Sequence, residues 1–218
     1  SVVPALVNTL IMTLLALMIA CPLGIGSAIY LVEYAGKGNR FVKIVRMTTE
    51  TLTGIPSIIY GLFGMLLFVV FLGWGYSILS GAATVAIMIL PTVMRTTEEA
   101  LLSIPDSYRE GSFGLGAGKL RTVNKIILPA AVPGILSGII LAVGRVVGET
   151  AALIYTSGTV AQIPQNLLGS GRTLAIHMYV LSSEGLHTNQ AFATAVVLLV
   201  MVVAINSFAA VIAKKIKT

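Results

Sequence analysis

The chain has 218 residues and a formal net charge of +6; 56% of its residues are hydrophobic and only 10% are charged. Because soluble domains carry about 25% charged residues, this composition excludes an ordinary soluble domain and indicates an integral membrane protein. The single cysteine, Cys21, excludes a disulfide within the chain.

Five apolar runs, taken in chain order, are candidates for membrane-spanning helices, since a helix needs about 20 residues to cross the hydrocarbon core. The runs cover residues 6–31, 52–72, 78–94, 133–155 and 191–212. They predict an all-α polytopic membrane protein with five transmembrane helices in one domain, residues 1–218. Pro22, Pro56 and Pro91 lie inside these runs and are expected to kink or interrupt them.

Lysine and arginine gather in three segments, which the five runs place on one side of the membrane. These segments hold 12 of the 14 basic residues: Lys37, Arg40, Lys43 and Arg46; Arg95, Arg109, Lys119, Arg121 and Lys125; Lys214, Lys215 and Lys217. Because basic loops stay in the cytosol, the C-terminus is predicted to be cytoplasmic and Ser1 extracytoplasmic. An odd number of spans with Ser1 outside favours a further span before this sequence. The first basic segment predicts an amphipathic helix against anionic lipid, rather than a contact with nucleic acid.

Two of the predicted connections are long, a cytosolic loop of about residues 96–128 and an external loop of about residues 156–190, and loops of this length are usually functional. In the cytosolic loop, Ser107 and Glu110 fit a capping box that starts a short helix. Its apolar residues Phe113 and Leu115 suit insertion into the groove of a partner protein. The nearby stretch GLGAGKL does not have the order of a phosphate-binding loop, because Leu120 follows Lys119.

The same cytosolic loop resembles the signature of ABC-importer permeases, E-A-A-x3-G-x9-I-x-L-P. All spacings match from Glu110 to Pro129, and the two alanine positions of the signature are held by Gly111 and Ser112. The resemblance implies a coupling helix that docks on an ATP-binding subunit supplied as a separate chain. The residues it assigns to this contact are Glu110, Gly111, Ser112, Phe113, Leu115, Gly116 and Ala117. It implies no catalytic residue and no cofactor here, since ATP and Mg belong to the partner.

A finer resemblance covers nearly the whole chain, from about Leu6 to Lys215. The stretches CPLGIGSAIYLVEYAGKG, IPSIIYGLFG, LPTVMRTTEEALLSIPDSYREGSFGLGAGK and LAVGRVVGETAAL are similar to permeases of Pst-type phosphate importers, and GET followed by AAL is closer to the A subunit. This implies a type I, MetI-like permease that usually has six spans and moves inorganic phosphate into the cytoplasm. Its implied partners are two ATP-binding chains, a second related permease and an extracytoplasmic phosphate-binding protein.

Two alternatives remain open at this point. The substrate could be another oxyanion, such as sulfate, molybdate or phosphonate, because the coupling helix would look the same. A stand-alone secondary transporter or channel is a second alternative. A membrane-bound enzyme is disfavoured, because the sequence contains no nucleophile–base or metal constellation; His177 and His187 lie ten residues apart with no cysteine near them.

Charged residues inside the fourth run are the candidates for the substrate path. Arg145 and Glu149 are four residues apart and are predicted to share one helix face. Each charge in mid-membrane costs about 2.5–3.5 kcal/mol on insertion scales, so the pair either neutralises itself for packing or lines the path. The guanidinium of Arg145 matches phosphate oxygens, and Glu149 is expected to accept the phosphate proton's hydrogen bond and to disfavour sulfate. Arg95 provides a second cation, or instead pairs with Glu98 or Glu99.

Overall fold

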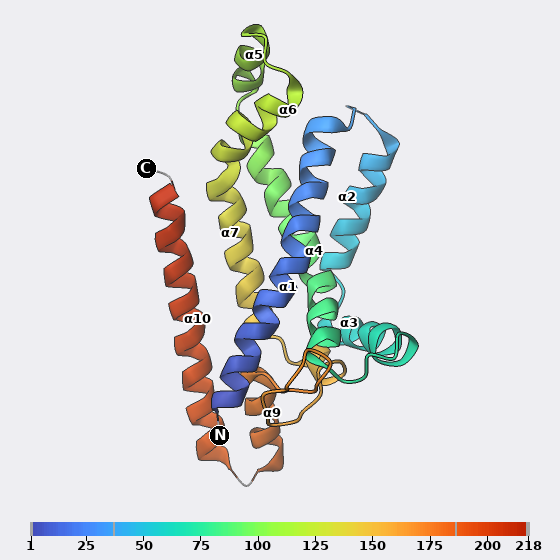
Figure 1. Ribbon diagram of the computed structural model, residues 1–218, viewed down its shortest axis with the longest axis vertical. Coiled ribbons are helices and arrows are strands. Elements are labelled where there is room, and N and C mark those ends of the chain that lie inside the picture. Colours follow the sequence, from blue (N-terminus) through green and yellow to red (C-terminus); the bar gives the residue numbers. More distant parts are fainter. Residues whose placement is uncertain (1, 37, 186, 217–218) are drawn as a thin grey trace.

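The computed structural model describes residues 2–36, 38–185 and 187–216, with side chains placed up to Val211, and these ranges contain helices and connecting loops but no strand. Four helices are long and apolar enough to cross a membrane: Val3–Tyr34, Ile78–Leu102, Lys119–Val147 and Thr188–Val211. Figure 1 shows these helices side by side along the long axis of the molecule. The all-α polytopic fold predicted from the sequence is confirmed. Ser1, which was predicted to be extracytoplasmic, and Lys217, one of the basic residues predicted to be cytoplasmic, lie outside the described residues.

The core of the bundle is formed by α1 (Val3–Ile29) and α4 (Ile78–Leu102), with α7 (Leu128–Val147) against α4. Small residues of α1, including Ala16, Ala20 and Gly24, are buried at its contact with α4. A Cβ on Gly24 would lie 2.9 Å from the Val93 side chain, so glycine permits this close approach of two helices in lipid. Both α1 and α4 continue through their prolines, Pro22 and Pro91.

The second predicted span, residues 52–72, is not a single helix, and this prediction is corrected. The chain forms α2 (Arg40–Thr53), breaks, and continues as α3 (Ser57–Gly64) and the π-helical turn η2 (Met65–Phe71), with a bend of 103°. Pro56 causes the break, because it lacks an N–H and disfavours a helical conformation of the residue before it. The Tyr60 hydroxyl donates to the carbonyl of Leu52 across the bend, at 2.7 Å. The described part of the chain therefore has four candidate spans, or five if the bent pair crosses the membrane as one.

The basic helix expected at residues 40–46 is present as the start of α2, but its orientation differs from a helix lying flat on a lipid surface. Figure 1 shows α2 running alongside the long helices, and it packs on α4. Arg46 of α2 forms an ion pair with Glu98 of α4, which ties the two helices together.

The two ends of the bundle differ in structure (Figure 1). At one end, here called the α5 end, α5 (Asp106–Gly114) and α6 (Lys119–Thr122) project beyond the long helices, and the π-helical turn η3 (Val123–Ile127) leads into α7. At the opposite end, the α9 end, lie the start of α1, the short helices α8 (Ala151–Ile154) and α9 (Leu174–Glu184), and irregular chain between them. The last helix, α10 (Thr188–Ile216), packs on α7 and α9 and is otherwise largely exposed.

The predicted loops are shorter in the structure than in the sequence interpretation. The α4 helix continues to Leu102, and α6 begins at Lys119, so the loop predicted at 96–128 is reduced to residues 103–118 around α5. The loop predicted at 156–190 contains α9 and the first turn of α10. The loops are shorter because α4 continues past the apolar run to Leu102 and α10 begins before its apolar run, at Thr188. Hydropathy does not indicate such polar helix ends.

Candidate functional site

The first candidate site is the segment that projects at the α5 end, residues 103–122, here called the α5–α6 segment. Glu110, Gly111, Phe113, Leu115 and Gly116 are exposed on it, and Leu115 is 92% exposed. Large apolar side chains held out on a short helix can insert into a groove of a partner protein. Six of the seven residues predicted for the coupling contact are therefore at least partly accessible, counting half-buried Ala117.

The exception is Ser112, which is buried and serves the internal structure of the segment. Its hydroxyl is 2.8 Å from the hydroxyl of Thr122, so it joins α5 to α6. Between the two helices Gly116 has a φ of +80°, a left-handed conformation that glycine adopts without strain, and the N–H of Ala117 donates to the carbonyl of Ser112. Serine at position 112, where the signature has alanine, thus supplies a hydrogen bond that alanine could not form.

The predicted capping box at Ser107 and Glu110 is not formed, and this prediction is wrong. The helix starts one residue earlier, at Asp106, with Pro105 at the N-cap position and no side-chain cap. Proline fixes the backbone that enters the helix, and the carboxylate of Asp106 favours the positive end of the helix dipole. Glu110 is left exposed and free for a contact outside the chain.

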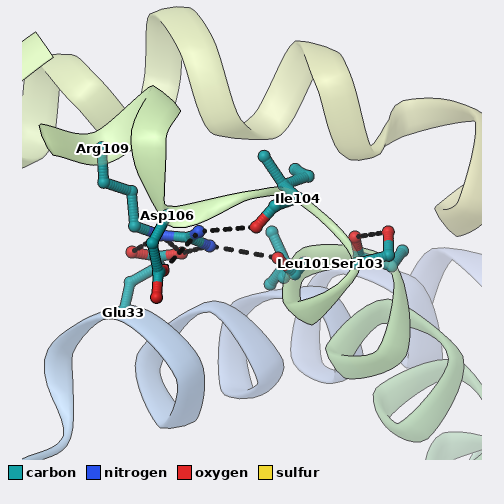
Figure 2. A network of polar contacts seen from close by, with 7 residues as sticks. Glu33, Leu101, Ser103, Ile104, Asp106 and Arg109 are labelled. Carbon is teal, nitrogen blue, oxygen red and sulfur yellow. Dashed lines mark hydrogen bonds and ion pairs between the residues drawn. The ribbon is translucent and has the colours of Figure 1, made fainter. Parts of the chain in front are cut away.

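A network centred on Arg109 anchors α5 to the bundle, and sequence reasoning did not find it (Figure 2). Its guanidinium donates to the Glu33 carboxylate, with a shortest distance of 2.7 Å, and to the carbonyls of Leu101 and Ile104 at 3.1 and 3.0 Å. A further hydrogen bond reaches Asp106 at 3.2 Å. The hydrogen bond from Arg109 to Glu33 raises the pKa of Arg109 above its usual value. The cation nearest to Glu33 in the sequence is Lys37, four residues later, so the sequence carried no signal that Arg109, 76 residues away, is its partner.

The second candidate site contains Arg145 and Glu149, but the prediction that they share one helix face is wrong. The α7 helix ends at Val147, because Gly148 follows and the chain turns into α8. Glu149 lies past the helix end, is only 8% exposed, and accepts a 3.0 Å hydrogen bond from the N–H of Ala152 in the first turn of α8. Its carboxylate therefore serves as an acceptor for a helix N-terminus rather than as the neighbour of Arg145.

Arg145 is half-buried in the last turn of α7, where the helix dipole favours a cation. Among the side chains that the structure describes, it forms no ion pair. Its guanidinium donors remain available for another group.

Arg95, the third predicted path residue, lies apart from these two on an exposed face of α4. Its guanidinium pairs with Glu99 at 3.0 Å, and both side chains are more than half exposed. Glu98 takes Arg46 as its partner instead. The structure therefore brings Arg95 together with one of its two predicted alternative partners.

Buried polar residues at the α9 end were also missed. The side-chain amide of Asn8 donates to the carbonyls of Gln162 and Arg172, at 2.9 and 3.2 Å, and the Thr9 hydroxyl accepts from the N–H of Leu174 at 2.9 Å. These bonds tie the start of α1 to the chain between α8 and α9. Burial lowers the pKa of Arg172 and of His177, and the charge of Arg172 lowers the pKa of His177 further. In the described ranges no three metal-ligating side chains gather into a site.

The long apolar helices and the projecting, anchored α5–α6 segment define a polytopic helical membrane protein with an exposed apolar surface at one end of its bundle. Residues 20–218 match the family described as "Binding-protein-dependent transport system inner membrane component", and the chain belongs to this family. It is the permease component of an ABC transporter and is not itself the catalytic subunit.

Solved structures show the same fold at low sequence identity. The chain is similar to a chain of the MetNI methionine ABC transporter, with a TM-score of 0.76 and 20% identity, covering 99% of this chain and 94% of the other. A bacterial ABC transporter that imports alginate gives a TM-score of 0.75 at 18% identity, covering 99% and 80% of the two chains. The MetI-like fold that the whole-chain resemblance implied is confirmed.

Curated relatives are closer in sequence. "Probable ABC transporter permease protein YqgI" of Bacillus subtilis is 36% identical over 83% of this chain and 66% of its own length. "Phosphate transport system permease protein PstA 1" of Mycobacterium tuberculosis is 37% identical over 95% of this chain and 68% of its own length. The chain thus spans about two thirds of the length of the curated relatives it matches.

Proposed function

We propose that this chain is a permease subunit of an ATP-driven importer that moves inorganic phosphate into the cytoplasm. The observation that carries the proposal is the 37% identity, over 95% of the chain, to a permease named for phosphate transport. Relatives from other mycobacteria and from Xylella fastidiosa that carry the same PstA name are 34–38% identical.

The orientation proposed for the molecule places the α5 end in the cytosol. Arg109, Lys119, Arg121 and Lys125 lie at this end, in agreement with the preference of basic residues for the cytosolic side. The exposed Phe113 and Leu115 would enter a groove of an ATP-binding subunit, and Glu110 would meet it at the polar rim. The ATP and its Mg belong to that subunit. The α9 end then faces the extracytoplasmic phosphate-binding protein.

The substrate path is proposed to pass Arg145. A guanidinium without an ion-pair partner in a half-buried position carries a large desolvation cost, which a dianion passing beside it would offset. The bidentate donors of arginine match two phosphate oxygens. Arg95 is the weaker candidate, because Glu99 already satisfies part of its charge.

Glu149 is proposed to discriminate phosphate from sulfate. One oxygen of its carboxylate accepts from Ala152, and the other oxygen has no hydrogen bond within the described structure. That second oxygen can accept from the protonated oxygen of hydrogen phosphate and repels sulfate, which has no proton to donate. The variant Glu149→Gln can keep the bond to Ala152, so it removes the charge while it leaves the helix start intact. Sulfate should inhibit phosphate uptake more strongly in Glu149→Gln than in the wild type. Equally weak inhibition by sulfate in both proteins would contradict this role.

The proposed function is tested with the chain assembled with an ATP-binding subunit pair, a second permease and a phosphate-binding protein in proteoliposomes. Phosphate should stimulate ATP hydrolysis and accumulate inside, whereas the permease chain alone should be inactive. Stimulation by sulfate, molybdate or phosphonate instead of phosphate would reassign the substrate. Gradient-driven uptake by the chain alone would identify a secondary transporter and contradict the proposal.

A further inference from the structure

The contact between Arg109 and Glu33 joins the α5–α6 segment to a helix that is remote from it in sequence. All five N–H donors of Arg109 are used, two toward Glu33 and the others toward Leu101, Ile104 and Asp106. The Glu33 side chain is only 6% exposed and that of Arg109 only 16%. A bidentate arginine in such a position has a fixed geometry, which a lysine would not reproduce.

Apolar packing does not fill the space between the α5–α6 segment and the end of α1. A groove of about 720 Å³ lies there, lined by Glu33, Tyr34, Phe113 and Lys119, among others. The groove is bridged by the Arg109–Glu33 ion pair and by the Lys119 ammonium, which lies 5.4 Å from the centre of the Tyr34 ring. Polar contacts across an open groove can transmit force and can also be removed individually without leaving a hole in an apolar core.

Glu33 lies at one end of a continuous helical rod whose other end is anchored at the opposite side of the bundle. The helical residues Val3–Tyr34 are unbroken, and from Glu33 to Asn8 they extend roughly 40 Å. At the α9 end, Asn8 and Thr9 of the same rod bind the backbone of residues 162, 172 and 174. Figure 1 shows α1 passing from the level of α2 to the level of α9.

We propose that the Arg109–Glu33 ion pair is the joint through which displacement of the α5–α6 segment is transmitted to α1, and that α1 carries it to the loop between α8 and α9. Arg109 and Glu33 are positioning residues in this scheme; neither needs to touch substrate or nucleotide. The proposal rests on the proposed function, since it requires that a partner subunit moves the α5–α6 segment.

The first test measures ATP hydrolysis and phosphate uptake in the same proteoliposomes for Glu33→Gln and Arg109→Gln. Both variants should assemble with the ATP-binding subunit and hydrolyse ATP, while phosphate uptake per ATP falls about tenfold, the size of a typical coupling energy. Asp106→Asn is the matched control, because Asp106 contacts the same arginine but is 78% exposed, and it should leave the ratio unchanged. An unchanged ratio in Glu33→Gln and Arg109→Gln would overturn the proposal.

The second test does not depend on the substrate. Spin labels on Val3→Cys and Leu120→Cys, both exposed positions, are introduced into the assembled complex with Cys21→Ala. The distance between the labels should stay narrowly distributed with and without a nucleotide analogue in the parent, and should broaden or shift with nucleotide in Glu33→Gln. Equal distributions in the parent and the variant would refute the joint. A parent complex that hydrolyses ATP without moving phosphate would refute the proposed function. The label distances would still show whether the Arg109–Glu33 ion pair transmits the displacement to α1.

Discussion

At the scale of single residues, the charges of this chain separate into groups that hold the structure and groups with donors to spare. Arg109 and Arg46 are satisfied by carboxylates of other helices, and Arg95 by a neighbour on its own helix. Arg145 has none of these, and Glu149, its expected partner, is used by α8. A charge that costs free energy to bury and is not used for packing is the strongest residue-level indication of a path for an anion.

Replacing Arg145 by glutamine should therefore abolish most of the transport without disturbing the fold. The loss of a charge-assisted hydrogen bond to the dianion corresponds to about 10–100-fold in transport rate. Phosphate uptake by cells that depend on this importer, normalised to the amount of permease in the membrane, measures the effect. Arg95→Gln is the comparison variant and should lose less. Undiminished uptake in Arg145→Gln at normal abundance would remove Arg145 from the path.

The buried His177 gives the α9 end a predictable pH dependence of stability. Its pKa is lowered in the folded protein by burial and by the nearby charge of Arg172, from an unfolded value of 6.5. The unfolded chain therefore binds a proton that the folded protein resists, so stability is fully present above pH 6.5 and decreases as the pH falls below it. Thermal unfolding in detergent should show Tm decreasing from about pH 7.5 to about pH 5.5, and the decrease should be smaller in His177→Gln. An identical decrease in both proteins would assign the pH dependence to other groups.

At the scale of elements, glycine and proline decide where helices meet and where they stop. Pro56 turns the second apolar run through 103°, while Pro22 and Pro91 are accommodated inside α1 and α4. Gly61 of α3 lies against the backbone of α8, where a Cβ would be 2.8 Å from the Cα of Ala152. The N–H of Ala152 in α8 also donates to the Glu149 carboxylate. The contact between α3 and α8 therefore positions the second candidate site.

Gly61→Ala should consequently destabilise the protein, because the clash involves backbone that cannot rotate away. Overpacking of this kind costs about 1–3 kcal/mol. Gly26→Ala in α1 is the control, since a Cβ there meets nothing within 4 Å. Membrane abundance and Tm in detergent should fall for Gly61→Ala and stay near the parent values for Gly26→Ala. Equal behaviour of the two variants would show that α3 can move away from α8 freely.

At the scale of the whole molecule, two exposed surfaces indicate that the chain works inside an assembly. Phe113 and Leu115 are exposed on the α5–α6 segment. This segment projects beyond the long helices (Figure 1). The outward face of α10 exposes Phe192, Leu199 and Phe208, which suits lipid or a second permease. The surface on the α5–α6 segment contains few large apolar side chains, so a single substitution there tests assembly more sharply.

Leu115→Asp should prevent docking of the ATP-binding subunit while the permease still inserts and folds, because Leu115 makes few contacts within its own chain. A charge placed in an apolar interface costs several kcal/mol, enough to lose a co-purified partner. Leu120→Asp, exposed on the adjacent α6, is the matched control and should retain more of the partner. The ratio of ATP-binding subunit to permease after affinity purification measures the effect. A normal ratio in Leu115→Asp would place the docking surface elsewhere.

Hydropathy and motif spacing in the sequence determined that the chain is a helical membrane permease, because both signals are local in the sequence. Only the tertiary structure decided which charges pair. Glu33 and Arg109 are 76 residues apart, and Glu149 left the expected helix face because α7 ends two residues before it. A one-dimensional pattern predicts the face of a helix only where the helix continues, and it carries no information on which distant helix lies opposite.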